Sequence, residues 1–407
     1  MNSKLGEVGS FIHFGCWNKH LCINSDDSNP DDSGITRVMR GLRHFITEHK
    51  RDFMIVAGDN YYPNISKEKK DGIKIKIKIK KIVKKNLCSG LNCLPKNITT
   101  YLLLGNHDLE DNIKLETEST TCDYNDNLKC CILKFQQNYV KKNKNMIMDD
   151  YTNDTALHKV IEKNGNKTLV LMIDTNIYEK DSIKKFENCL KLLENYKGTN
   201  EGENYRQEIM EKHYNRIINI INKVHEMGNL KNIVFVGHHP ISRYVRKEEG
   251  SQIKYVYMED FGNMVMKVYE YLKGNYDINF YNLCADTHLY QKGKIKFVNG
   301  LVLEQHICGT GGTTLDAEVT VGNINMEKSS FKIKNHTYDV EISEKQYGFL
   351  DVIMKDDGSL TFNPILIPEN MPQTAGRKLI KNNKNKKSSK SSKSKKSKKS
   401  RKNKPRK

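Results

Sequence analysis

The stretch YLLLGNHD, residues 101–108, joins a short apolar run to a cluster of polar residues. The run Tyr101–Leu104 is typical of a buried β-strand, because it is short, apolar and followed by a glycine. Asn106, His107 and Asp108, which follow, carry oxygen and nitrogen atoms that bind metals or move protons. In α/β proteins, ligand sites gather at the carboxyl ends of the strands. The stretch therefore predicts a functional site at the end of a sheet.

Four more motifs of this kind lie along the chain, and the runs before them also read as buried strands. The motifs are Gly15-Cys16-Trp17-Asn18, Gly58-Asp59-Asn60-Tyr61-Tyr62, Gly237-His238-His239-Pro240 and Ala285-Asp286-Thr287-His288. The runs are Phe11–Phe14, Met54–Val56, Ile233–Val236 and Phe280–Leu283. Donor side chains that converge from different strands are hard to explain as core packing, so we expect them to form one site.

The remaining pattern favours an α/β fold. Leu169–Ile173 is a further buried run, and apolar residues recur at helical spacing between Tyr205 and Met227. Strands that alternate with helices are typical of α/β proteins. After about residue 301 the helical signal fades, and the chain predicts more strands of the same domain. These are Leu301–Ile307, Tyr347–Met354 and Leu360–Ile367.

One low-complexity segment allows two interpretations. Ile73–Ile79 alternates isoleucine and lysine strictly. Alternation of this kind fits a strand with one buried face, and it fits equally an insertion on a helix or loop.

The net charge of +19 comes from one end of the 407-residue chain. Arg377–Lys407 holds 17 of the 68 basic residues and no acidic residue, so residues 1–376 carry a net charge of only +2. This excludes a uniformly basic protein that coats nucleic acid. From about Lys381 the chain is Lys, Ser and Asn, which cannot bury enough apolar surface to offset the entropy of ordering. We therefore predict a domain at 1–376 and a disordered basic tail at 377–407.

The tail has two interpretations. Clusters such as Lys395–Lys399 suit nuclear import or nonspecific contact with nucleic acid through phosphates. The alternative is a solubilising terminus without a partner.

Met1–Ser10 does not resemble a secretory signal, so we expect an intracellular protein with reduced cysteines. We expect no membrane span, because no stretch approaches the roughly 18 apolar residues that one needs.

Three of the motifs, taken in order, resemble those of the calcineurin-like metallophosphoesterases. They are Gly58-Asp59 with Tyr62, Gly105-Asn106-His107-Asp108, and Gly237-His238-His239-Pro240. The likeness is greatest to the purple acid phosphatase branch, which is marked by the tyrosine three residues after the aspartate. Weaker agreements are Ile173-Asp174-Thr175-Asn176, Gly309-Thr310-Gly311-Gly312 and Tyr347-Gly348-Phe349. The resemblance covers roughly Phe11 to Ile367.

The resemblance implies an α/β (α+β) four-layer sandwich, in which two mixed β-sheets are flanked by helices. It also implies hydrolysis of a phosphate ester, like that of an acid phosphatase, at a site with two metal ions. A metal-bound hydroxide would attack phosphorus directly, and no phospho-enzyme would form. The partner is then a phosphorylated substrate.

The resemblance also implies a role for each matching residue. Asp59 would bridge both metals, with Tyr62 and His288 on the first metal, and Asn106 and His238 on the second. In the same scheme, His107 assists the leaving oxygen and Asp108 orients His107. His239 neighbours the predicted site, so it is a candidate to contact the substrate, and the alternative is a turn residue before Pro240.

Two positions depart from the family pattern. Cys16 stands where the family has aspartate, and Asp286 stands where the family has histidine. Both residues can bind a metal, so we expect both as ligands. They would make the site one anion richer, which weakens the Lewis acidity of the metals and raises the pKa of their water. A sulfur ligand favours iron or zinc over magnesium, with manganese an alternative.

Four alternatives stay open. Cys16 is also suited to be a small buried residue without a metal, and Asp286 to form a turn. For the chain as a whole, one alternative is a metallophosphoesterase fold with impaired catalysis, which acts as a binding module. The other is a nucleic-acid-binding protein driven by the tail.

Overall fold

The computed structural model describes most of the chain between residues 9 and 367. The described residues are 9–19, 33–62, 87–110, 121–122, 126–127, 131–149, 155–180, 202–273, 277–319 and 336–367. They belong to one compact unit, Met1–Ile367. The segment Ile73–Ile79 and the tail from Arg377 lie outside the described residues, so their interpretations stay predictions, as does the domain boundary at 376.

The first large sheet is built on continuous apolar strands. In the described part of the chain its strand order is β17-β16-β1-β2-β3-β6. The strands are β1 (Ser10–Phe14), β2 (Phe53–Ala57), β3 (Thr99–Leu103), β6 (Met146–Ile147), β16 (Tyr347–Met354) and β17 (Leu360–Ile367). β1, β2, β3 and β6 run parallel, and β16 pairs antiparallel with β1. β1 and β2 are buried throughout, as expected of strands that are covered on both faces.

The second large sheet has the described order β15-β13-β14-β12-β9-β8-β7. Its strands are β7 (His158–Lys163), β8 (Asn166–Met172), β9 (Leu230–Val236), β12 (Asn279–Cys284), β13 (Tyr290–Phe297), β14 (Val302–Cys308) and β15 (His336–Glu344). β8, β9, β12 and β14 are parallel, and the edges are antiparallel. The central strands are the apolar ones, and the edge strands alternate polar with apolar residues.

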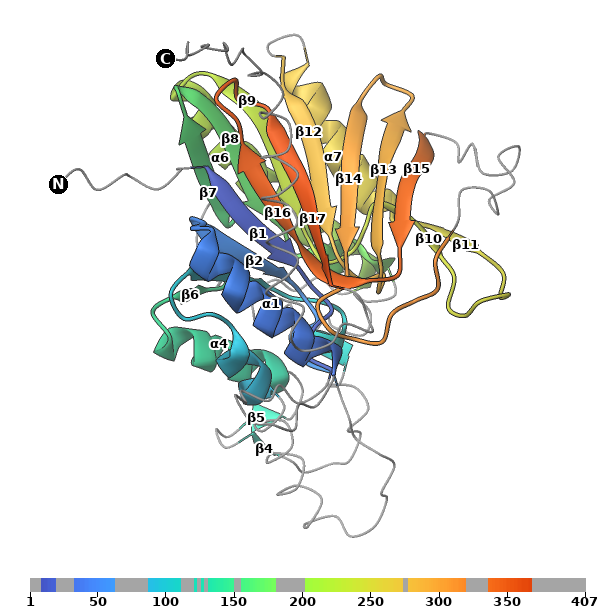
Figure 1. Cartoon of the computed structure of the whole chain (residues 1–407). Helices are drawn as coiled ribbons and strands as arrows, with labels where there is room; N and C mark the ends of the chain where they lie inside the picture. Colours follow the sequence, from blue (N-terminus) through green and yellow to red (C-terminus); the bar gives the residue numbers. More distant parts are fainter. Residues whose placement is uncertain are drawn as a thin grey trace, which may run out of the picture. The chain divides into compact units, whose positions relative to one another are not determined.

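Helices cover the outer faces of both sheets (Figure 1). The helices α1 (Gly34–Glu48) and α4 (Cys131–Lys142) lie on the first sheet, and α6 (Gly202–Glu226) and α7 (Glu259–Leu272) lie on the second. One apolar core joins α1, the first sheet and the inner residues of β8, β9 and β12, and another joins α6 and α7 to the second sheet. The result is the predicted four-layer arrangement of two mixed sheets between helices.

Shorter elements complete the described structure. They are α3 (His107–Glu110), β4 (Thr121–Cys122), β5 (Asp126–Asn127), the 3-10 helix η1 (Thr175–Tyr178), and the hairpin strands β10 (Ser242–Val245) and β11 (Lys254–Tyr257). Of these, α3, η1 and β10 follow directly on strands that end near one another, so they border the loops that carry the motifs.

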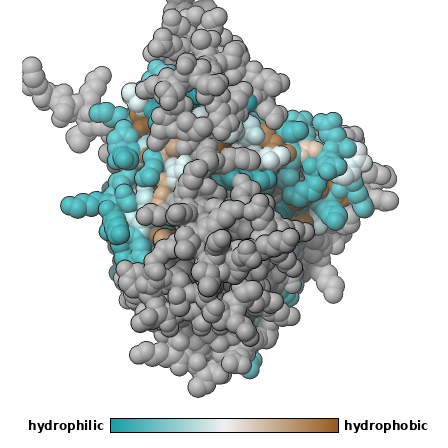
Figure 2. Space-filling view, turned by 90° about the horizontal axis from the view of Figure 1, so that it is seen from below, coloured by the Kyte–Doolittle hydropathy of each residue, from teal (hydrophilic) through white to brown (hydrophobic). Residues whose placement is uncertain are grey.

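Among the described residues, no helix is both long and apolar enough to cross a bilayer. Seen from below, the coloured surface is mostly hydrophilic, with hydrophobic atoms in small areas (Figure 2).

Among the cysteines whose side chains the structure describes, Cys93 departs from the expectation of reduced thiols. Cys16, Cys88, Cys284 and Cys308 are free, but Cys93 is disulfide-bonded. The reduced state is therefore wrong for Cys93, because spacing along the sequence does not reveal which cysteines the fold brings together.

Candidate metal centre

Backbone hydrogen bonds tie the motif loops to one another at the ends of the strands. The Cys16 N–H donates to the Gly58 carbonyl oxygen at 3.3 Å, and the Ala285 N–H donates to the His238 carbonyl oxygen at 2.9 Å. A Cβ atom on Gly105 would overlap a carboxylate oxygen of Asp59. Gly105 is therefore needed here because its loop and the loop that carries Asp59 approach each other closely.

Asp59 lies at the centre of the site. The hydroxyl of Tyr62 donates to its Oδ2 atom at 2.6 Å, and Cys16 Sγ lies 3.6 Å from the same oxygen. Its Oδ1 atom accepts from the His107 N–H at 3.3 Å and lies 3.4 Å from His238 Nε2. The two oxygens of one buried carboxylate thus face two different sets of donors.

His238 has a defined orientation. Its Nδ1–H group donates a hydrogen bond to the Ala57 carbonyl oxygen, at a distance of 2.8 Å. Its Nε2 atom then faces three oxygens, from Asn106 at 3.1 Å, Asp59 at 3.4 Å and Asp286 at 3.6 Å. A backbone carbonyl that holds the far nitrogen in this way is the usual support of a metal-binding histidine.

The backbone is left-handed at three of the motif residues. Cys16, Asp59 and Asp286 have φ angles of 52°, 56° and 55°. Such angles are uncommon outside glycine, and cysteine is not among the residues that adopt them readily. Unfavourable backbone angles of this kind cluster at functional sites. The side chains of all three residues face the centre, as their contacts with one another and with His238 show.

His288 approaches the centre from the side of Tyr62. Its Nε2 atom lies 3.3 Å from the Tyr62 hydroxyl. Asp316 holds its backbone, because the His288 N–H donates to the Asp316 carboxylate at 3.0 Å and the Asp316 N–H donates back to the His288 carbonyl at 2.8 Å. The sequence motifs did not single out Asp316.

His107 and Asp108 are adjacent in sequence but differ in surroundings. The His107 ring is half-buried and packs against Tyr62, with ring centroids 4.6 Å apart. Asp108 is buried and accepts hydrogen bonds from the Gly105 N–H at 2.8 Å, the Gln136 amide at 2.8 Å and Asn60. Asp108 thus holds the loop that carries His107. Burial, and then the charge of Asp59, raise the pKa of Asp108 to about 7.

His239 lies behind His238. Its Nδ1 atom is 2.9 Å from the Thr175 hydroxyl, and its Nε2 atom is 3.4 Å from a Glu179 oxygen. Burial, and then the neighbouring His238, hold the pKa of His239 well below its ordinary value, which keeps the ring neutral. Thr175 comes from the weaker motif that follows Leu169–Ile173.

Asp286 has a cationic partner that the motifs did not reveal. The guanidinium of Arg243, on β10, forms an ion pair with Asp286 Oδ2. The expected excess of negative charge is therefore offset at this position by Arg243. Arg243 follows Pro240 by only three residues, but nothing in the sequence connects it to Asp286.

Two of the predicted ligands carry protons. Burial, and then Asp59, raise the pKa of the Cys16 thiol well above its ordinary value, and the same two causes raise the pKa of Tyr62. The carboxyl group of Asp59 behaves differently. Burial acts to raise its pKa, but His238, His107 and the Tyr62 hydroxyl together hold it below the ordinary value. Cys16 and Tyr62 are thus donors to an ionised Asp59, and each would release its proton on binding a metal.

The arrangement fits metal ions. The ligand atoms of Cys16, Asp59 and His238 lie within 4.8 Å of one another, and so do those of His238, His239 and Asp286. Thiol, carboxylate and imidazole groups together are typical of sites for zinc or iron.

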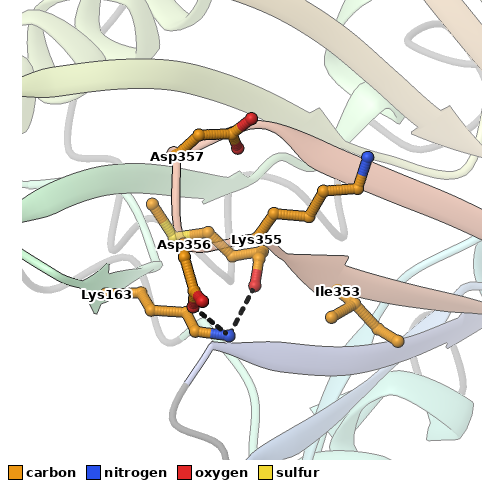
Figure 3. Close-up of a pocket in the computed structure, with 6 residues that line it drawn as sticks. Lys163, Ile353, Lys355, Asp356 and Asp357 are labelled. Atoms are coloured by element: carbon orange, nitrogen blue, oxygen red, sulfur yellow. Dashed lines mark hydrogen bonds and ion pairs between the residues drawn. The ribbon is translucent and has the colours of Figure 1, made fainter.

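A separate pocket lies at the opposite end of the first sheet, near the start of β1 (Figure 3). Its volume is about 450 Å³, and Lys163 and residues 353–357 line it. The Lys163 amine already contacts Asp356 at 3.1 Å and the Met354 carbonyl at 3.2 Å. None of the predicted site residues lines this pocket, so we place the chemistry at the motif loops.

Comparison with known families decides the identity of the fold. The sequence profile described as calcineurin-like phosphoesterase matches residues 9–266, which is more than half of the chain. The chain belongs to the calcineurin-like phosphoesterase family. The motif Ala285-Asp286-Thr287-His288 lies beyond the matched residues. No curated protein matches the sequence of this phosphoesterase significantly.

Several solved structures share the fold at low identity. The phosphoesterase is 13% identical to the purple acid phosphatase PPD1 of yellow lupin (Lupinus luteus), with a TM-score of 0.41, over 88% of this chain and 52% of the lupin chain. It is 10% identical to PhoD, with a TM-score of 0.42, over 95% and 78% of the two chains. It is 12% identical to a putative 5'-nucleotidase from Staphylococcus aureus, with a TM-score of 0.40, over 92% and 58%. The chain thus spans about half the length of the lupin phosphatase.

Proposed function

We propose that this calcineurin-like phosphoesterase hydrolyses phosphate esters at a centre of two metal ions, as an acid-phosphatase-like hydrolase. The observation that carries the proposal is the division of Asp59 between two sets of donors. One carboxylate oxygen faces Cys16 and Tyr62, and the other faces His238. A carboxylate shared in this way is suited to bridge two cations.

Each set of donors would hold one metal ion. Cys16, Tyr62 and His288 would bind the first, and Asn106, His238 and Asp286 the second, with Asp59 between them. Iron and zinc suit the sulfur and nitrogen ligands, and manganese is the alternative. Bound metal ions would supply positive charge for the phosphoryl oxygens and lower the pKa of a water molecule.

The side chains around the centre would handle the substrate and the leaving group. His107 is half-buried beside Tyr62, so its ring is placed to donate a proton to the leaving oxygen of an ester. Asp108 contributes by fixing the loop that carries His107, through the Gly105 N–H and Gln136. His239 is buried next to His238, with its ring nitrogens beside Thr175 and Glu179, so the proposal gives it a place behind His238 and no contact with the substrate.

We further propose that residues 1–376 suffice for this activity and that residues 377–407 form a separate basic tail. The assigned donors all lie before Ile367, at the ends of strands. Deletion of Lys381–Lys407 should therefore leave the rate of ester hydrolysis unchanged.

The test begins with metal content. The purified chain should bind two metal ions, and the chain loaded with iron, zinc or manganese should hydrolyse an aryl phosphate. Removal of the metals with a chelator should abolish turnover, and their return should restore it. Absence of hydrolysis with every metal across a broad pH range would refute the proposal.

A leaving-group series tests the role of His107. His107→Gln should slow hydrolysis of an alkyl phosphate by about 100-fold or more, because this leaving oxygen needs a proton. An activated aryl phosphate, whose leaving group departs as an anion, should be affected much less. His44→Gln, on the exposed side of α1, is the matched control. An equal loss with both substrates would contradict the assignment.

A further inference from the structure

Arg243 is a charged residue of the centre that lies outside all five sequence motifs. Its guanidinium forms an ion pair with Asp286 Oδ2, while the other oxygen, Oδ1, lies 3.6 Å from His238 Nε2. Asp286 is therefore held between a permanent cation and a nitrogen that also faces Asn106 and Asp59. One oxygen is bound to Arg243, and the other remains directed into the centre.

The pair lies mostly inside the protein. The side chain of Arg243 is 19% exposed and that of Asp286 is 15% exposed. A charge at this depth is costly unless a partner compensates it, so each of the two residues depends on the other. Together they carry no net charge, although Asp286 Oδ1 would still be available to a metal beside His238.

The ion pair with Arg243 offsets the additional negative charge that Asp286 brings to the centre. At the position where the family pattern has a neutral histidine, this chain has a carboxylate with its own counter-charge. We propose that Arg243 is a positioning residue of the metal centre, which neutralises Asp286 and fixes its Oδ1 atom beside His238. The inference rests on the proposed function, because it requires a metal bound by Asn106, His238 and Asp286.

The simpler alternative is that Arg243 only attaches the β10–β11 hairpin. The hairpin has other attachments: the Gln305 amide donates to the Ser242 carbonyl at 2.6 Å, and the Ala317 N–H donates to the Arg246 carbonyl at 2.9 Å. The strands also pair with each other from Ser242 to Val245. Loss of Arg243 should therefore affect the centre more than the fold.

The first experiment measures binding of Zn(II) alone, in competition with a coloured chelator. Arg243→Gln should weaken one of the two Zn(II) ions by about 10- to 100-fold, the usual effect of removing a group that orients a metal ligand. Arg243→Lys, which keeps the charge, should recover most of the affinity. Arg246→Gln, on the same hairpin, should bind like the original chain. Melting temperatures of the chelator-treated proteins check that each variant folds.

The second experiment repeats Arg243→Gln in an Asp286→His background. Here the guanidinium has lost its partner and repels the metal, so Arg243→Gln should strengthen Zn(II) binding by about 10-fold or more. An effect of the same sign and size in both backgrounds would overturn the inference. If Asp286→His does not fold, the comparison of Arg243→Gln with Arg243→Lys decides.

The outcomes separate the inference from the proposed function. If the original chain binds no Zn(II), the proposed centre itself is wrong. If the original chain binds two Zn(II) ions and Arg243→Gln binds them equally well, only the role of Arg243 is wrong.

Discussion

Replacing Cys16 by aspartate should destabilise the chelator-treated protein at neutral pH and make its stability more dependent on metal. The position is suited to the change. Its φ angle of 52° is one that aspartate and asparagine adopt more readily than cysteine does. The cost therefore comes from charge, because Cys16 Sγ is only 3.6 Å from Asp59 Oδ2.

Two estimates of this cost agree. Two unit charges 3.6 Å apart repel by about 4–5 kcal/mol at an effective dielectric constant of about 20. The variant can avoid the repulsion by keeping one carboxyl group protonated, which costs about 4 kcal/mol at pH 7 for a group with an ordinary pKa of about 3.9. The variant should thus lose about 4 kcal/mol at most. In the folded variant, repulsion raises the pKa of the carboxyl group that stays protonated. The loss of folding stability therefore grows as the pH rises and shrinks to about 1.5 kcal/mol at pH 5.

The assay is the free energy of unfolding in urea, compared with Cys16→Asn, which has the same shape without the charge. Cys16→Asp should be less stable than Cys16→Asn at pH 7, and the gap should narrow at pH 5. Saturating Zn(II) or Mn(II) should close or reverse the gap, because a cation then lies between the carboxylates. Equal stability of the two chelator-treated variants at pH 7 would refute the reasoning.

Three further predictions follow from other parts of the structure. His13 is buried, with its Nε2 atom 3.0 Å from the Cys284 carbonyl oxygen, and burial lowers the pKa of its ring to about 4. The free energy of unfolding should therefore fall by about 3 kcal/mol as the pH falls from about 6.5 to about 4, because the unfolded chain takes up a proton first. Urea titrations of His13→Gln, which keeps a donor, should show a flatter pH dependence, and an unchanged slope would contradict this. Gly105→Ala should weaken Zn(II) binding by about 10-fold or more in a chelator competition, because its Cβ would overlap Asp59, and an unchanged affinity would contradict this. Arg51 donates to the two oxygens of the Asp351 carboxylate at 2.6 and 2.8 Å. Arg51→Gln should lower the free energy of unfolding in urea by about 3–5 kcal/mol, because it leaves the buried Asp351 carboxylate without a cationic partner. A loss below about 1 kcal/mol would show that the pair contributes little.

The inner strands could be predicted from the sequence because burial on both faces leaves a continuous apolar run. Met54–Val56 lies within β2, and Phe280–Leu283 lies within β12. β13, which lies between β15 and β14, could not be recognised in this way. It alternates lysine with apolar residues, since one face is half-exposed, and it pairs with β15. A strand of this kind depends on neighbours that are distant in the sequence.

The candidate site was predictable for a related reason. Parallel strands end at one edge of a sheet, so motifs that directly follow buried strands are brought together without further information. The exceptions are residues whose role depends on a partner from another loop. Asp316 reaches His288 through the backbone, and Arg243 reaches Asp286 across the centre. No spacing rule connects these pairs.

The contacts of Arg243 and Cys16 alter what the two departures from the family pattern imply for the charge of the centre. Counted from the motifs, Cys16 and Asp286 make the centre one anion richer. In the structure, Arg243 forms an ion pair with Asp286, and Cys16 replaces one potential anion by another. With the ligands proposed above, the centre would therefore differ from its family less in net charge than in the nature of one ligand, a sulfur in place of an oxygen. Because softness controls which metals bind, metal preference rather than charge is the property in which this phosphoesterase should diverge most.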